Sequence, residues 1–173
     1  EQVAAAGETT LELRRTLAAK VFARTAAYDA AIAAHLTREF SGPDAVLPAL
    51  AISAPLAQPL RYGENPHQRA AFYRETTHRS GTLADATRLQ GDLPSFNNLL
   101  DLEGALLAIE PFADQPACAI IKHTTPCGVA TGIDALSAYQ KALACDPVSA
   151  FGSVIAFTVP VDVAAAEAIS SLF

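Results

Sequence analysis

Apolar residues recur at helical spacing through the N-terminal part of the chain. Leucine, valine, tyrosine and isoleucine side chains follow one another at intervals close to one helical turn, at positions 13, 17, 21, 28, 32 and 36. Thr9 is followed by Glu12, which is a plausible capping box. The pattern therefore predicts a long helix, or two helices in series, over residues 10–39.

A proline-rich stretch follows this helical pattern. Phe40-Ser41-Gly42-Pro43 ends the helix, and prolines among small apolar residues continue as far as Pro59. This composition is typical of a linker. We therefore expect a domain boundary here, with a helical part over residues 1–54 and a second part over residues 55–173.

The second part alternates apolar runs with helical patterns. After a possible short strand at 70–73, a helix is predicted over 98–109, with Asn97 or Asn98 as its N-cap. Next come a buried strand over 117–122, a helix over 134–145 capped by Asp134, a strand over 153–159 and a helix after Asp162. Strands alternating with helices predict an α/β fold built on a βαβ unit.

Lys122 and His123 stand where the buried strand ends. Thr124-Thr125-Pro126 cannot readily continue the strand, because proline lacks the N–H donor and restricts the residue before it. Ligands of open α/β sheets collect beyond the carboxyl ends of strands. Histidine accepts a proton near neutral pH and lysine carries a fixed positive charge, so the pair suits catalysis. The alternative is a solvent-facing lysine beside a hydrogen-bonded histidine.

A second polar cluster occupies the loop LRYGENPHQ. Arg61 suits a bidentate grip on a phosphate or carboxylate, and the Tyr62 ring can stack on a heterocycle. His67 follows the turn over residues 63–66. An ordinary polar surface loop would have the same composition, and the loop before Gly152 taken alone is an ordinary helix-to-strand connection.

Composition and charge exclude several classes of protein. The chain has 173 residues, 51% of them hydrophobic, and a net charge of −6, which argues against disorder and against a general nucleic-acid surface. No apolar run approaches the roughly 20 residues needed to span a bilayer, and no signal peptide is seen. We therefore expect a soluble, cytoplasmic protein with no nucleic-acid or membrane partner. Since the chain begins at Glu1 and contains no methionine, we also expect a fragment of a longer protein.

The three cysteines do not predict a metal site or a disulfide framework. Their number is odd and no CxxC pair occurs. Pro126-Cys127 resembles half of the P-C-x-x-C motif of zinc deaminases, but Ala130 stands where the second cysteine would be. We expect no metal, and the role of Cys127 stays open.

Four segments of the chain are informative together: LRYGENPHQ, SFNNLLDLEGA, IIKHTTPCGVA and DPVSAFGSVIAF. In order and separation they resemble one known family, the bifunctional enzymes in which AICAR formyltransferase is joined to IMP cyclohydrolase. The earlier segment LRRTLAAKVFARTAAYDAAIAAHL is similar to the last helices of the cyclohydrolase domain. The resemblance implies that residues 1–54 belong to that domain and the linker. Residues 55–173 would then begin the formyltransferase domain, a cytidine-deaminase-like α/β fold without its zinc ligands.

The resemblance also implies a reaction in de novo purine biosynthesis. Enzymes of this family are homodimers that transfer a formyl group from 10-formyltetrahydrofolate to the 5-amino group of AICAR, giving FAICAR, and then close the ring to IMP. By resemblance, His123 takes the proton from the attacking amine and Lys122 stabilises charge on the formyl oxygen. The cyclohydrolase catalytic segments are not in this chain, and we expect the 173 residues alone to be inactive.

Further site residues follow from the same resemblance. Arg61 and Tyr62 would contact the nucleotide, His67 and Asn98 would support the site, and Gly152 would approach the substrate through its backbone. In a parallel βαβ unit, however, Gly152 would lie at the sheet edge opposite to Lys122. A non-catalytic, nucleotide-binding α/β module is the alternative function.

Overall fold

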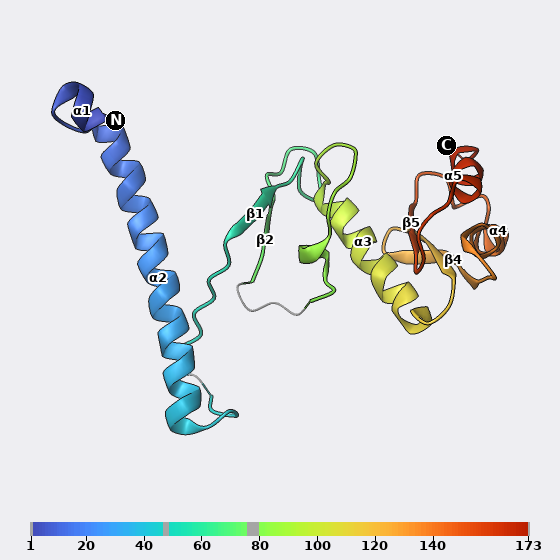
Figure 1. Ribbon diagram of the computed structural model, residues 1–173, viewed down its shortest axis with the longest axis horizontal. Helices are drawn as coiled ribbons and strands as arrows, with labels where there is room; N and C mark the ends of the chain where they lie inside the picture. The colour runs from blue at the N-terminus through green and yellow to red at the C-terminus, as the bar shows by residue number, and fades with distance from the viewer. Residues whose placement is uncertain (1, 47–48, 76–79, 173) are drawn as a thin grey trace. The chain divides into compact units, whose positions relative to one another are not determined.

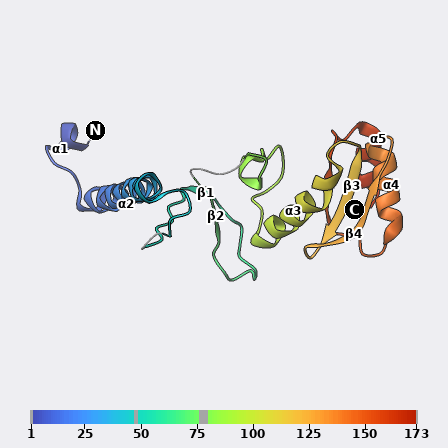
Figure 2. The same cartoon turned by 90° about the horizontal axis from the view of Figure 1, so that it is seen from below.

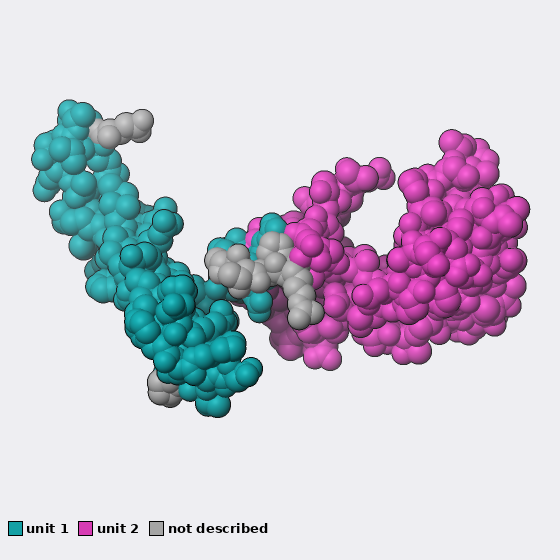
Figure 3. All heavy atoms as spheres, turned by 60° about the horizontal axis from the view of Figure 1, so that its bottom comes forward, with its two compact units in different colours: residues 1–56, 73–78 teal, residues 57–72, 79–173 magenta. Residues whose placement is uncertain are grey.

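The computed structural model describes residues 2–46, 49–75 and 80–172. The chain divides into two compact units, one formed by residues 1–56 with 73–78 and the other by residues 57–72 with 79–173 (Figure 3).

The first unit consists mainly of one long helix. A short helix α1 (Gln2–Ala6) precedes α2 (Leu11–Ser41) (Figure 1). Helix α2 begins after its N-cap Thr10, whose side chain accepts the N–H of Leu13. The predicted long helix is confirmed, but its cap is Thr10 and not Thr9. None of the α2 residues is buried, although apolar side chains define its pattern. In the described part of the chain, no helix is long and apolar enough to cross a membrane.

The rest of the described residues form three α-helices, two short 3₁₀ helices and two small sheets. Strands β1 (Leu56–Pro59) and β2 (Ala71–Tyr73) form a two-stranded sheet. The other elements are η1 (Leu83–Asp85), α3 (Phe96–Ile109), η2 (Glu110–Phe112), β3 (Ala117–Lys122), β4 (Thr125–Thr131), α4 (Ala135–Cys145), β5 (Val154–Phe157) and α5 (Val163–Ser170). The predicted α/β class is therefore correct.

The three-stranded sheet has the order β4-β3-β5, and both pairs of strands are antiparallel. The predicted parallel βαβ unit is therefore wrong. Strand β4 was missed because its segment contains Pro126, which removes a donor from a ladder. Proline is tolerated on an edge strand, and β4 is an edge strand of this sheet.

Helices cover both faces of the sheet (Figure 2). Cys118 and Ile120 of β3 pack in a cluster with α4 residues, while Ala119 and Ile121 pack in a second cluster with α3 residues. Because neighbouring residues of a strand point to opposite faces, both faces of β3 need apolar side chains. This double burial explains the uninterrupted apolar run that predicted the strand.

The N-terminus of α3 differs from the prediction. Ser95, and not Asn97 or Asn98, is the N-cap, and Ser95 and Asn98 form a reciprocal capping box. The buried Ser95 side chain accepts the N–H of Asn98, and Asn98 Oδ1 accepts the N–H of Ser95 at 3.0 Å. For α4 the predicted cap Asp134 is confirmed, and α5, which was predicted to follow Asp162, has Asp162 as its N-cap.

Candidate functional site

His123 and Thr124 form a tight turn between β3 and β4. Lys122 pairs with Thr125, so only these two residues connect the strands, and both have positive φ angles of 54° and 64°. Two-residue hairpins favour such turns, but usually with Asn-Gly. A β-branched residue such as Thr124 is an outlier in this region. Left-handed backbone costs on the order of 1–3 kcal/mol at each non-glycine residue, so surrounding contacts must hold this turn.

Helix α3 contacts this turn directly. The N–H of Thr124 donates to Asp101 Oδ1 at 2.7 Å, and Gly104 of the same helix lies against the Thr124 carbonyl. The Thr124 hydroxyl donates to the carbonyl of His123 at 2.6 Å. His123 itself is exposed at the turn, which leaves its imidazole accessible to a ligand.

Lys122 connects the end of β3 to the loop that precedes β5. Its Nζ donates to the carbonyl of Phe151 at 2.8 Å. The antiparallel pairing sets Ile121 opposite Val154, so the chain before β5 lies beside the end of β3. The structure therefore brings Gly152 to the same edge as Lys122, and the expectation that it would lie at the opposite edge is wrong.

Gly152 has a φ of 73°, which a side chain would strain. A Cβ atom built there would meet no atom within 4 Å. The backbone conformation therefore explains why the residue is glycine, and the space beside it is open. Such space lets a ligand approach the backbone closely.

Strand β4 contains a bulge directly after the turn. Ile121 pairs with Pro126 while Ile120 pairs with Gly128, which leaves Cys127 as an extra residue in β4. Bulges are frequent beside active sites, where they redirect side chains. Cys127 is half-buried, whereas Cys118 is fully buried and its pKa is raised to about 12 by desolvation.

The Arg61–Tyr62 pair is ordered by its own contacts. The Arg61 guanidinium lies 5.0 Å from the centroid of the Tyr62 ring, within cation–π range, and Nη2 is 3.4 Å from the tyrosine hydroxyl. After Gly63 the chain turns back, since the N–H of Gly63 donates to the carbonyl of Gln68. The predicted turn is thus confirmed, with His67 exposed within it.

Hydrogen bonds attach this loop to the start of α3. Arg61 N–H donates to the carbonyl of Pro94, and Phe96 N–H donates to the carbonyl of Tyr62. Asn97 Nδ2 donates to the carbonyl of Glu64 at 3.0 Å. The Arg61–Tyr62 loop therefore has a fixed position relative to the helix.

One face of α3 contacts both the Arg61–Tyr62 loop and the His123–Thr124 turn. Asn97 binds the Arg61–Tyr62 loop, and Asp101, four residues later, binds the His123–Thr124 turn. Residues three and four apart are neighbours on a helix surface. Asn98, which forms the capping box with the N-cap Ser95, lies one turn before Asp101. Among the described residues no hydrogen bond joins the two groups directly, and α3 is the element that links them.

The structure shows contacts to the candidate site that the sequence did not predict. They are made by the Asp101 carboxylate, by the backbone of Gly104 and by the carbonyl of Phe151. A glycine within a helix is unfavourable, so Gly104 was a signal of close packing that the sequence offered. The catalytic and binding roles predicted for the site residues stay predictions.

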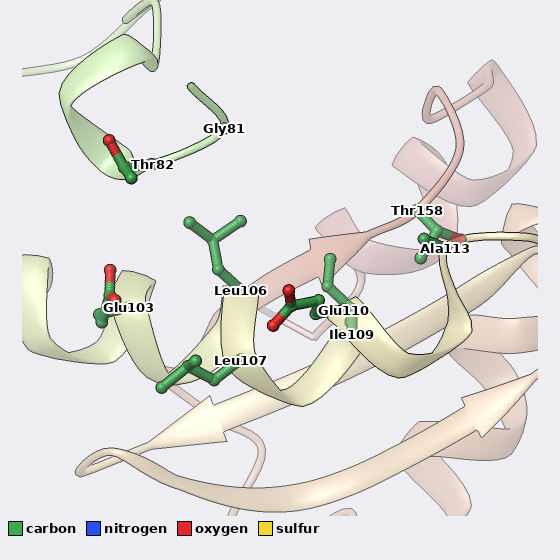
Figure 4. Close-up of a pocket in the computed structure, with 9 residues that line it drawn as sticks. All are labelled: Gly81, Thr82, Glu103, Leu106, Leu107, Ile109, Glu110, Ala113 and Thr158. Carbon is green, nitrogen blue, oxygen red and sulfur yellow. The ribbon is translucent and has the colours of Figure 1, made fainter. Parts of the chain in front are cut away.

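A cavity of about 380 Å³ lies elsewhere on α3 (Figure 4). Its lining is mainly apolar, and its charged members, Glu103 and Glu110, are both acidic. Glu103 lies two residues from Asp101, and so on the nearly opposite side of the helix. Two carboxylates disfavour a phosphate-bearing ligand, so this cavity is not the candidate site.

These observations define an α/β protein in which a lysine–histidine strand end contacts a glycine loop and is linked by helix α3 to an arginine–tyrosine loop. The chain belongs to the AICARFT/IMPCHase bienzyme family, whose model matches residues 1–173.

Curated relatives agree with this family. The chain is 49% identical to the "Bifunctional purine biosynthesis protein PurH" of Rhizobium rhizogenes, over 100% of the chain and 32% of that protein. It is 52% identical to the protein of the same name from Caulobacter vibrioides, over 97% of the chain and 32% of the relative. For the Desulfitobacterium hafniense protein the identity is 47%, with 96% and 33% covered. The chain thus spans about a third of the length of these relatives.

Proposed function

We propose that the chain carries part of the AICAR formyltransferase site of a bifunctional purine biosynthesis enzyme. The reaction transfers a formyl group from 10-formyltetrahydrofolate to the 5-amino group of AICAR and gives FAICAR. The family match over residues 1–173 and the name of the relatives, bifunctional purine biosynthesis protein, support this proposal. Residues 55–173 would begin the formyltransferase domain, and residues 1–54 would end the cyclohydrolase domain and form the linker.

The contact between Lys122 and the loop before Gly152 is the observation that carries the proposal. Two segments that resemble the family separately in sequence meet here at one sheet edge, with a 2.8 Å bond from Lys122 Nζ to the Phe151 carbonyl. An ammonium group has three donors, and this bond engages one of them. The others are suited to a substrate that lies beside Gly152.

Lys122 and His123 have complementary roles in the proposed chemistry. The amine nitrogen of AICAR attacks the formyl carbon, and negative charge develops on the formyl oxygen. Lys122 would stabilise that charge, and His123 would accept the proton that the amine loses. The bond from the formyl carbon to the folate nitrogen then breaks, and that nitrogen takes up a proton.

The Arg61–Tyr62 loop would hold the nucleotide. Arg61 carries the positive charge that a phosphate requires, and the Tyr62 ring, on which the guanidinium lies, offers an aromatic face. Asn98 and His67 would support this end of the site. The homodimer, the cyclohydrolase activity and the cytoplasmic location stay predictions that depend on the family resemblance.

Substitution of the catalytic pair tests the proposal in the complete polypeptide that carries these 173 residues. His123→Ala should lower kcat for formyl transfer by about 10²- to 10⁴-fold, the usual contribution of a general base. Lys122→Gln should lower it by about 10²- to 10³-fold, as for removal of an oxyanion donor. Nucleotide affinity, measured by calorimetry, should stay within a few-fold for His123→Ala. A non-catalytic nucleotide module would instead show no formyl transfer in the parent and changed affinity in the variants.

A further inference from the structure

The His123–Thr124 turn depends on contacts from outside the hairpin. Both of its residues have positive φ angles, and neither is a glycine. The two hydroxyl bonds near the turn, from Thr124 and Thr125, both go to the carbonyl of His123 and so are local to the turn. Local bonds alone do not fix the hairpin relative to the rest of the fold. Contacts with a different element must do so.

Asp101 supplies a directed contact to this turn. Its Oδ1 accepts the N–H of Thr124 at 2.7 Å, across 23 positions of the chain. A hydrogen bond to a carboxylate is stronger and shorter than one between neutral groups. Because the bonded N–H belongs to the peptide that joins His123 to Thr124, the bond restrains the backbone directly after the His123 Cα atom.

Gly104 allows α3 to approach the same peptide segment. A Cβ atom at this position would lie 3.1 Å from the Thr124 carbonyl oxygen and 3.5 Å from Ile121 Cγ2. Gly104 does not have a positive φ, so its backbone conformation does not require glycine. Close approach to the turn is therefore the reason for glycine here. Asp101 and Gly104 are three residues apart and share one face of α3.

We propose that Asp101 and Gly104 are positioning residues that hold the His123 imidazole in the orientation needed to accept the substrate proton. This inference rests on the proposed function, in which His123 is the proton acceptor. Asp101 fixes the direction of the Thr124 N–H, and Gly104 sets the separation between the helix and the turn. Neither residue needs to contact the substrate.

Three variants of the complete polypeptide test this proposal. Asp101→Ala removes the acceptor and should lower kcat by about 10- to 100-fold, while KM for AICAR changes less than about threefold, because misplacement of a catalytic group slows chemistry. Asp101→Asn keeps an oxygen acceptor and should recover kcat to within about fivefold of the parent. Glu103→Ala, on the other side of the same helix, is the matched control and should leave kcat unchanged.

Gly104→Ala separates positioning from folding. Alanine favours the helix, whereas its methyl group displaces the turn by a few tenths of an ångström. Thermal stability should therefore stay close to that of the parent while kcat falls by about 10-fold. This variant also keeps the test valid if Asp101→Ala does not fold.

The outcomes distinguish this inference from the proposed function. Formyl transfer that depends on His123 but stays within twofold of the parent in both Asp101→Ala and Gly104→Ala would overturn the positioning role alone. A parent enzyme without formyl transfer would overturn the proposed function. In that case the His123 imidazole resonance, followed by NMR, still tests the inference: Asp101→Ala should shift it and Glu103→Ala should not, and equal spectra would refute the restraint.

Discussion

Gly128 is the position where a single methyl group should damage the fold most clearly. It lies in β4, directly after the bulge, where α4 crosses the strand. A Cβ atom at this position would lie 2.0 Å from the carbonyl oxygen of Ala142 and 2.9 Å from its carbonyl carbon. Both atoms belong to the helix backbone, so no side-chain rotation relieves the contact. Gly128→Ala must therefore push α4 away from β4.

The size of this effect follows from what α4 buries. The distance from the added Cβ to the Ala142 oxygen is too short by about 1 Å, so α4 must move away from β4 by about that much. A gap of about 1 Å loses a quarter to a half of the dispersion energy across an interface. Tyr139 and its neighbours Ala138 and Ala142 are fully buried on this side of the sheet. Overpacking usually costs about 1–3 kcal/mol, and a backbone-to-backbone clash belongs at the upper end. We expect a loss of about 3 kcal/mol, or a melting temperature lower by about 10 °C.

Urea denaturation of the 173-residue chain, followed by circular dichroism, measures this loss. Gly91→Ala is the control, because its Cβ would meet nothing within 4 Å although its φ is 87°. We expect a cost of about 1 kcal/mol for that change, from the left-handed backbone alone. A Gly128→Ala chain within 1 kcal/mol of the parent would refute the packing of α4 on β4, and with it the position of the hairpin.

Three further predictions concern thiol reactivity, acid stability and activity. At pH 8 a thiol reagent should label the exposed Cys145 in the folded chain and Cys118 only after unfolding, because burial raises the pKa of Cys118 to about 12; labelling of both at equal rates would contradict this. Hydrogen bonds from Ser137 lower the pKa of Asp134 below its usual 3.8, so the stability that this cap contributes is present above pH 3.8 and is lost as the pH falls through the lowered folded value. Acid titrations should therefore show a larger loss for the parent than for Asp134→Asn, and parallel curves would argue against the cap. The isolated 173-residue chain should show little or no formyl transfer in a product assay, and a rate near that of full-length relatives would overturn this expectation.

The sequence predicted the elements whose signals are local. The strand that ends at Lys122 is apolar throughout because α3 and α4 cover its two faces, and this double burial is visible in composition. The helix after Asp134 was also predicted correctly, because its cap and periodicity are contained within a short stretch. Long α2 was predicted from periodicity and a plausible capping box, although most of the apolar side chains that define its pattern remain exposed in the described structure.

Strand pairing was not predictable from the same signals. His123 and Thr124 form the turn without the glycine or asparagine that usually indicates a hairpin, and Pro126 argued against a strand. The turn is held by Asp101 from a distant helix, and such a contact leaves no local pattern. For this reason the sequence led us to expect a parallel βαβ unit, whereas the sheet is antiparallel.

The candidate site shows the same division. Lys122, His123 and Arg61 were selected from motifs and from the chemistry of their side chains. The meeting of Lys122 with the loop before Gly152 depends on how β3 pairs with β5, which the motifs do not encode. For Gly104 the sequence signals close packing but not its partner, and the contact with Thr124 becomes visible only when the helix and the turn are seen together.

Lys122 and His123 are proposed to carry out formyl transfer at this sheet edge. The most direct measurement is the single-turnover rate of FAICAR formation from AICAR and 10-formyltetrahydrofolate, with the complete polypeptide in excess over both substrates. We expect a measurable rate in the parent and a rate at least about 100-fold lower in His123→Gln, with an unchanged circular dichroism spectrum. Equal single-turnover rates in the parent and His123→Gln would contradict it.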